Sequence, residues 1–259
     1  MSDPKPSPRL AATVLLVRDR AHGLEVFMVE RHHQIDFATG ALVFPGGKVD
    51  PADADPALRP RCGESLAADD DTRALRVAAI RETFEECGVL LARARGAESL
   101  FSRAAPGSEF AALVAREDLL LACDQLVPWA HWITPAVVPK RFDTHFFVAA
   151  APEDQLALHD GNESVDSVWI TPADALRAAE TGTRTIIYPT LMNLARLAES
   201  RDVAGALERA RKQPVVTVQP TIARGADGKP KLAIPAEAGY PALPAALARF
   251  ESVEGIGRG

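Results

Sequence analysis

Cysteine is scarce in this chain of 259 residues, and so are long apolar runs and any excess of positive charge. The three cysteines, Cys62, Cys87 and Cys123, are odd in number and lack Cys-x-x-Cys spacing, which argues against a disulfide framework or a cysteine zinc site. No apolar run is long enough to cross a membrane. The net charge of −6, with both signs mixed along the chain, predicts no basic face for nucleic acid.

The composition favours a globular protein of a reducing compartment. Hydrophobic residues make up 47% of the chain, enough to bury a core, and the first ten residues are polar and proline-rich, unlike a signal segment. We therefore expect a cytoplasmic protein that binds neither nucleic acid nor a membrane. If its ligand is an anion, the positive charge that meets it must be placed locally.

Apolar patterning predicts a mixed α/β chain built around one main domain. Runs rich in branched and aromatic residues predict strands at 10–19, 23–32, 40–48, 132–138, 141–151 and 164–170. Longer periodic segments predict helices at 72–92, 108–126, 172–181 and 188–200, and a late hairpin spans 215–235. We expect a disordered lead at 1–9, a main domain at 10–200 with an inserted exposed loop at 51–70, and a C-terminal helix, hairpin and tail at 201–259 packed on that domain.

The segment "RETFEECGV", residues 81–89, gathers three glutamates on one side of a predicted helix. At about 100° per residue the opposite side carries an apolar stripe that faces a core, made of Val77, Ile80, Phe84, Cys87 and Leu91. Glu82, Glu85 and Glu86 converge because they are three and four residues apart, and Arg81 offsets only part of their repulsion. A divalent cation would turn this repulsion into a binding site. The alternative is an ordinary charged helix surface.

The segment "FPGGK", residues 44–48, is the second half of the pattern. A strand that breaks into two glycines lets the backbone approach a ligand closely, because no Cβ atom stands in the way. Taken alone, the tripeptide Pro45–Gly46–Gly47 is better explained as a simple turn. After the glutamates, Gly88 permits a left-handed turn that ends the main part of the helix.

Together these two segments resemble the signature of the Nudix hydrolases, in which a glycine, five residues, a glutamate and seven residues precede Arg-Glu-aliphatic-x-Glu-Glu-x-Gly-aliphatic. Gly47 matches the opening glycine, and the closing half is matched by Arg81, Glu82, Glu85, Glu86, Gly88 and Val89. Thr83 replaces the aliphatic residue, and the insertion breaks the spacing. The position eight residues before Arg81 is Arg73 rather than a glutamate, and Glu64 resembles the displaced equivalent.

The resemblance implies an α/β/α sandwich with a mixed β-sheet and a site for Mg²⁺ or Mn²⁺. It implies that the metal is held by Glu85, Glu86 and the Gly46 carbonyl, with Glu82 as a further ligand or a base and Arg81 orienting the carboxylates. A distal acid often completes such a site before a strand that contains tryptophan. Glu163, six residues before Trp169, is the candidate, with Asp160 and Asp166 as rivals.

Within the family, the insertion and the segment "HWITPAVVPKRFDTHFFVA" are similar to the coenzyme A diphosphatase branch. The implied substrate is a small nucleoside diphosphate linked to another moiety, first of all coenzyme A or acyl-coenzyme A. Arg31, Lys48 and Arg141 are the candidates to bind its phosphates, although Arg141 could instead pair with Asp143.

The alternatives are hydrolysis of ADP-ribose or a related nucleoside diphosphate derivative, and a non-catalytic module that senses a nucleotide. The intact carboxylate trio argues against a pure sensor, since a binder gains little from clustered like charges. Whether the chain forms a homodimer is left open.

Overall fold

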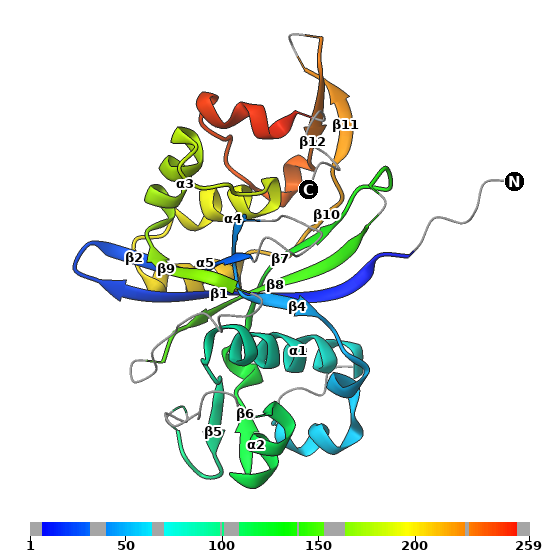
Figure 1. The fold of residues 1–259 in the computed structure, drawn as a ribbon, viewed down its shortest axis with the longest axis vertical. Helices are drawn as coiled ribbons and strands as arrows, with labels where there is room; N and C mark the ends of the chain where they lie inside the picture. Colours follow the sequence, from blue (N-terminus) through cyan, green and yellow to red (C-terminus); the bar gives the residue numbers. More distant parts are fainter. Residues whose placement is uncertain are drawn as a thin grey trace, which may run out of the picture.

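A computed structural model describes residues 7–31, 40–63, 70–98, 100, 109–138, 140–152, 164–225 and 228–252. Its centre is a mixed sheet in the order β10-β7-β8-β1-β2-β3, with β4 paired to β1 and β9 paired to β2 (Figure 1). The strands of this sheet are β1 (Arg9–Arg20), β2 (Gly23–Arg31), β3 (Leu42–Val43), β4 (Gly46–Lys48), β7 (Val127–Ile133), β8 (Phe142–Ala150), β9 (Ser164–Ile170) and β10 (Thr217–Val218).

Helices cover both faces of this sheet, so the predicted α/β/α sandwich with a mixed sheet is confirmed (Figure 1). One face carries α1 (Asp70–Cys87), α2 (Phe110–Arg116) and the small hairpin β5 (Ala92–Ala94) and β6 (Leu119–Leu121). The other carries α3 (Pro172–Thr181), α4 (Tyr188–Leu197), α5 (Val203–Lys212) and the hairpin β11 (Thr221–Arg224) and β12 (Pro230–Ala233). Short 3-10 helices are η1 (Pro51–Ala54), η2 (Pro56–Arg61), η3 (Cys123–Gln125), η4 (Ala236–Ala238) and η5 (Ala245–Glu251).

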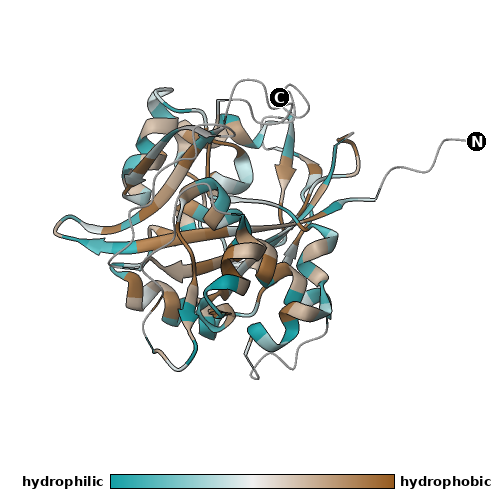
Figure 2. Ribbon diagram, turned by 60° about the horizontal axis from the view of Figure 1, so that its bottom comes forward, coloured by the Kyte–Doolittle hydropathy of each residue, from teal (hydrophilic) through white to brown (hydrophobic). Residues whose placement is uncertain are grey.

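Strand β1 separates two hydrophobic cores because successive side chains point to opposite faces. Val14 and Leu16 pack toward α1, whereas Leu15 and Val17 pack toward α3 and α4. The apolar colouring of the central strands in Figure 2 reflects this burial on both sides. β1 also pairs in parallel with β8 and antiparallel with β4, so it joins the glycine segment to the middle of the sheet.

Helix α1 bears out the periodicity of its sequence. The predicted stripe of Val77, Ile80, Phe84, Cys87 and Leu91 is buried in the core on this face. Gly88 has a φ of +70° and its N–H donates to the carbonyl of Phe84, so it ends the helix in the left-handed conformation that the sequence predicts. None of the described helices is both long and apolar enough to span a membrane.

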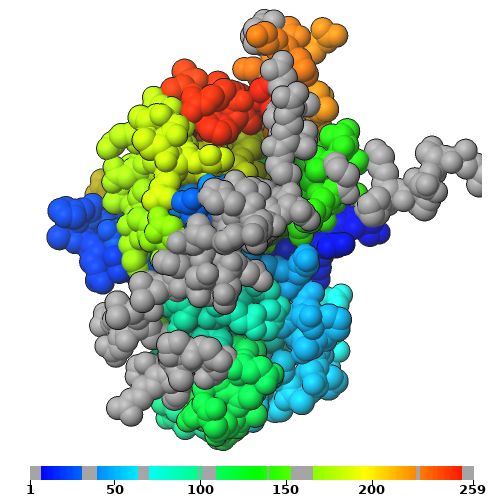
Figure 3. All heavy atoms as spheres, viewed as in Figure 1, coloured from blue at the N-terminus to red at the C-terminus, as the bar shows by residue number. Residues whose placement is uncertain are grey.

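Several expectations about local structure are wrong. The strand expected at 132–138 lies earlier, at Val127–Ile133, and the helix expected at 72–92 ends at Cys87. The helix expected at 108–126 stops at Arg116, because Asp118 adopts a positive φ of 47° and Leu119–Leu121 then pairs with β5 as a strand. The described part of the inserted loop is not simply an exposed loop, since Pro51–Ala54 and Pro56–Arg61 form 3-10 helices and both Asp53 and Cys62 are buried. Figure 3 shows this segment packed alongside α1. Sequence periodicity missed it because 3-10 turns of this length carry no apolar stripe.

Candidate active site

The three glutamates lie in the last two turns of α1, where the helix passes beside β4. Glu86 is only 7% exposed, and its carboxylate accepts a hydrogen bond of 2.9 Å from the N–H of Gly46. Glu82 is also mostly buried, whereas the side chain of Glu85 is 46% exposed. The fold therefore brings the glutamates of the helix and the glycines of the "FPGGK" segment together, although 40 residues separate Gly46 from Glu86.

The two glycines are required by close backbone approaches at this point. A Cβ atom added to Gly47 would lie 2.4 Å from the carboxylate of Glu82. Gly46 has a φ of +153°, and a Cβ there would lie 2.4 Å from the carbonyl oxygen of Ala12 on β1. Gly47 thus lets the carboxylate of Glu82 pack directly against the backbone of β4, and Gly46 lets β4 lie close to β1.

Arg81 holds the acids of this cluster in place. Its guanidinium donates to Asp53 through two nitrogens at 2.8 Å each, to Glu82 at 2.8 Å and to Glu85 at 2.9 Å. A further bond of 3.0 Å runs to the carbonyl of Lys48. Burial acts to lower the pKa of Arg81, but the hydrogen bond to Asp53 and the charges of Glu82 and Asp53 outweigh it and raise that pKa above its ordinary value. Arg81 is therefore a permanent cation that orients its neighbours.

Asp53 is a site residue that the sequence reasoning missed. It lies in the insertion, its side chain is 2% exposed, and it binds Arg81 in the two-pronged geometry that carboxylates and guanidiniums favour. The sequence contains the signal: Gly47 is followed by five residues and then Asp53, an acid one methylene shorter than the glutamate of the Nudix signature. Counting backwards from Arg81 led instead to Arg73, which binds Asp70, and to Glu64, which lies outside the described residues.

The donor set fits a divalent cation of the Mg²⁺ class. Asp53, Glu82, Glu85 and Glu86 outnumber the single guanidinium of Arg81, and all are oxygen donors, which hard cations prefer. The glutamates also occupy the C-terminal end of α1, where the helix dipole opposes negative charge. An acid cluster in that position is unfavourable by itself, and a bound cation would offset this cost.

The predicted distal acids and phosphate-binding residues do not join the carboxylate cluster in the described part of the chain. Asp166 on β9 pairs with Arg184 at 3.0 Å, so it is engaged elsewhere. Lys48 follows Gly47 in β4, and strand alternation directs its exposed side chain to the face opposite Glu82. Arg141 donates to the carbonyl of Thr134 at 3.1 Å, and the carboxylate of Asp143, its expected partner, binds His131. Glu163, Asp160 and the side chain of Arg31 lie outside the described part of the chain.

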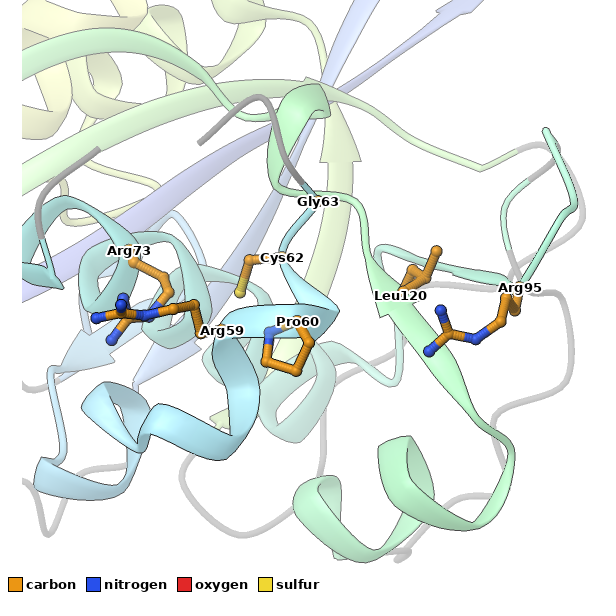
Figure 4. Close-up of a pocket in the computed structure, with 7 residues that line it drawn as sticks. All are labelled: Arg59, Pro60, Cys62, Gly63, Arg73, Arg95 and Leu120. Carbon is orange, nitrogen blue, oxygen red and sulfur yellow. The ribbon is translucent and has the colours of Figure 1, made fainter. Parts of the chain in front are cut away.

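A hollow of about 750 Å³ lies near the other end of α1 and is lined by Arg59, Pro60, Cys62, Gly63, Arg73, Arg95 and Leu120 (Figure 4). Its arginines do not make it an anion site, because Arg59 and Arg73 bind Asp70 and Arg95 binds Asp118. Nine residues of helix, about 13 Å, separate Arg73 from Glu82. The candidate active site is therefore the carboxylate cluster and not this hollow.

Comparisons with known proteins show what the whole chain is similar to. The family model for the NUDT19 Nudix domain matches residues 58–197. The protein named "Putative nudix hydrolase 7" of Caenorhabditis elegans is 28% identical over 204 residues, which cover 75% of this chain and 62% of that protein. The human protein named "Acyl-coenzyme A diphosphatase NUDT19" is 29% identical over 207 residues, covering 60% of this chain and 55% of that protein.

Among solved structures, a NUDIX hydrolase from Alicyclobacillus acidocaldarius is 31% identical, with a TM-score of 0.68. The match covers 79% of this chain and 97% of that one. By contrast, the chain spans less than two thirds of the length of the two curated relatives.

Proposed function

This chain belongs to the Nudix hydrolase family, and on that premise we propose that it is a Mg²⁺- or Mn²⁺-dependent pyrophosphohydrolase acting on a nucleoside diphosphate linked to another moiety. The observation that carries the proposal is the carboxylate cluster at the end of α1, in which Arg81 binds Glu82 and Glu85 and Glu86 accepts from the Gly46 N–H. The first substrate class that we propose is coenzyme A or acyl-coenzyme A.

Each residue of the cluster has a separate part in this proposal. Glu85, Glu86 and the carbonyl of Gly46 would hold the metal, with Glu82 beside them. Such an ion, when bound, neutralises diphosphate oxygens and lowers the pKa of an attacking water. Arg81 orients Glu82 and Glu85 by hydrogen bonds, and the buried carboxylate of Asp53 in turn fixes the position of Arg81.

A carboxylate must also accept the proton of the attacking water, and Glu82 and Glu163 are the two candidates. Glu82 lies within the cluster, against Gly47, but its charge is already shared with Arg81. The variants Glu82→Gln and Glu163→Gln separate the two: the base is the residue whose loss removes the acidic limb of the pH–rate profile.

The substrate class rests on similarity and on charge. The curated relatives include acyl-coenzyme A diphosphatases, and coenzyme A carries a 3′-phosphate besides its diphosphate. Its site therefore needs a positive group apart from the metal, and Arg31 and Arg141 are the proposed sources, because the side chain of Lys48 points to the face opposite Glu82. The products would be 3′,5′-ADP and 4′-phosphopantetheine or its acyl form.

The test compares kcat/KM for coenzyme A and its 3′-dephospho form, with Mg²⁺ and with Mn²⁺. Loss of one charge-assisted contact is expected to cost about 1.5–3 kcal/mol, or roughly 10- to 150-fold in kcat/KM. Equal rates on both compounds, or faster hydrolysis of ADP-ribose, would contradict the coenzyme A assignment and favour a nucleoside diphosphate derivative. The Glu86→Gln variant, purified in parallel, controls for contaminating hydrolases.

A further inference from the structure

A second group of metal-ligating side chains lies on the central sheet, apart from the glutamates. His131 is on β7, and Asp143 and His145 are on β8. One nitrogen of His131 lies 2.5 Å from the carboxylate of Asp143, and Nε2 of His145 lies 3.6 Å from the same oxygen. One donor atom from each residue lies within 4.8 Å of the others, and all three side chains are partly buried.

The strand register explains why these three residues meet. Asp143 and His145 are two apart on β8, so their side chains lie on the same face of the sheet. His131 is directly opposite His145 on the neighbouring strand β7. Two strands of a central sheet thus fix all three side chains, and rigid elements of this kind position ligands more accurately than loops do.

We propose that His131, Asp143 and His145 form a binding site for a transition-metal ion of the Zn²⁺ class. Two imidazoles and a carboxylate are the donors that such ions bind in three-ligand sites, which leave a fourth position for water. The second ring nitrogen of His131 lies 2.8 Å from the hydroxyl of Thr217 on β10. A hydrogen bond from the outer nitrogen of a ligating histidine to a neighbouring oxygen is the usual way in which such a ring is oriented.

The arrangement of the rings defines what binding requires. The imidazoles of His131 and His145 are stacked, with centroids 4.0 Å apart and planes inclined by 23°. Zinc lies about 2.0–2.2 Å from each nitrogen or oxygen ligand and in the plane of a ligating imidazole, so two donors on one ion are about 3.3 Å apart. Binding therefore replaces the His131–Asp143 hydrogen bond and moves those two donor atoms apart from 2.5 Å. It also turns one ring about its Cβ–Cγ bond and brings His145 slightly closer to Asp143.

This site is separate from the carboxylate cluster, although both lie on the α1 face of the sheet. His145 pairs with Ala12 of β1, and Ala12 pairs with Gly47 of β4. Two strand spacings of about 4.8 Å place the backbone of His145 roughly 10 Å from that of Gly47. The two sites should prefer different ions. The carboxylate cluster has only oxygen donors and should prefer Mg²⁺ or Mn²⁺, whereas the site with two imidazoles should prefer Zn²⁺ or Co²⁺.

The experiment titrates the full chain, first freed of metal with a chelator, with Zn²⁺ against a chromophoric competitor and with Co²⁺ as a spectroscopic probe. The Glu85→Gln/Glu86→Gln double variant serves as the background, so that the carboxylate cluster does not contribute. We expect one equivalent of Zn²⁺ in this background and a Co²⁺ spectrum typical of four-coordinate nitrogen and oxygen ligation.

Single substitutions then assign the ligands. His131→Ala, Asp143→Asn and His145→Ala should each weaken Zn²⁺ binding more than about 100-fold, and Thr217→Val by about 10-fold. His22→Ala, at an exposed turn, is the matched control and should leave binding unchanged. Circular dichroism identifies variants that fail to fold. For a histidine variant that fails, the conservative His131→Gln or His145→Gln replaces the alanine substitution. No stoichiometric Zn²⁺ in the background variant, or binding that survives all the ligand substitutions, would overturn the proposal.

Discussion

The acids at the two ends of helix α1 are balanced by arginine to different extents. At its start, the side chain of Asp70 is 62% exposed and binds two arginines, Arg59 and Arg73. At its end, the single guanidinium of Arg81 contacts three carboxylates, and Glu86 adds a fourth acid beside them. Asp71 is the other acid of the first turn, so arginines match the acids at the start of α1, whereas acids exceed cations at its end.

The helix dipole adds to this difference, because it acts in opposite directions on acids at the two ends of a helix. Acids at the N-terminus of a helix are stabilising, whereas acids in the last turns face the partial negative charge of unpaired carbonyls, at about 0.3–1 kcal/mol each. Asp70 therefore needs no ligand to be favourable where it is. The glutamates do, and their cost persists in the fold because Arg81 and Asp53 hold them together. Charge that opposes both its neighbours and its helix indicates function more strongly than charge alone.

The largest expected effect is on the free energy of unfolding, and it comes from Asp53, the buried acid that binds Arg81 near the end of α1. Asp53→Asn removes the buried charge that faces Arg81, and breaking a buried pair in this way is expected to lower the free energy of unfolding by about 3 kcal/mol. Urea denaturation measures the loss. Asp70→Asn, an acid that is also paired with arginine but exposed, is the matched control and should lose much less. Equal losses of unfolding free energy in the two variants would show that the ion pairs at the two ends of α1 contribute alike to stability.

The next effect is on turnover. Glu86→Gln keeps the shape of the side chain and an acceptor for the Gly46 N–H, but removes a proposed metal ligand. We expect kcat/KM to fall more than about 100-fold at saturating Mg²⁺, with the circular dichroism spectrum unchanged, because losing a ligand exceeds the 10- to 100-fold cost of losing its outer partner. Glu85→Gln should behave alike. A rate near wild type for either variant would remove that residue from the site.

Metal addition should stabilise the protein through the acids at the end of α1 and not through Asp70 at its start. At a concentration near 100 times its dissociation constant, Mn²⁺ is expected to add about 2.7 kcal/mol to the stability of the wild-type chain. Thermal unfolding with and without Mn²⁺ measures the gain. Asp70→Asn should retain it in full, and an equal gain in Glu86→Gln would show that the ion binds elsewhere.

The smallest effect has the opposite sign. Without metal, Glu85→Gln should raise the free energy of unfolding by about 0.5 kcal/mol, since it relieves repulsion from Glu82 and Glu86 while Gln can still accept from Arg81. Calorimetry in the presence of a chelator measures this gain as a rise of roughly 1–2 °C in Tm. A loss of stability instead would mean that the Arg81 ion pair outweighs the repulsion.

Much of the fold could be read from the sequence because it is local. The stripe from Val77 to Leu91 and the turn at Gly88 predict α1 and its end, and the glutamates follow on its other side. Proline and glycine likewise bound α3, whose first turn contains Pro172 and whose C-cap is the left-handed Gly182. These features depend on neighbours within one or two turns of chain.

What the sequence did not predict depends on contacts between distant segments. Asp53 is buried because it binds Arg81, which lies 28 residues further along the chain. No periodicity in the sequence of the insertion predicts that contact. Leu119–Leu121 is a strand because β5 is available to pair with it, which overrides the helical pattern of 108–126. The meeting of His131 with His145 likewise depends on the register of β7 against β8.

The central claim is that the acids at the end of α1 form a divalent-cation site. Titration of the metal-free chain with Mn²⁺, followed by the electron paramagnetic resonance signal of the free ion, tests it without reference to any substrate. The account predicts saturable Mn²⁺ binding in the wild type and in Asp70→Asn, weakened more than about 100-fold in Glu86→Gln. Equal Mn²⁺ binding in all three proteins would contradict it.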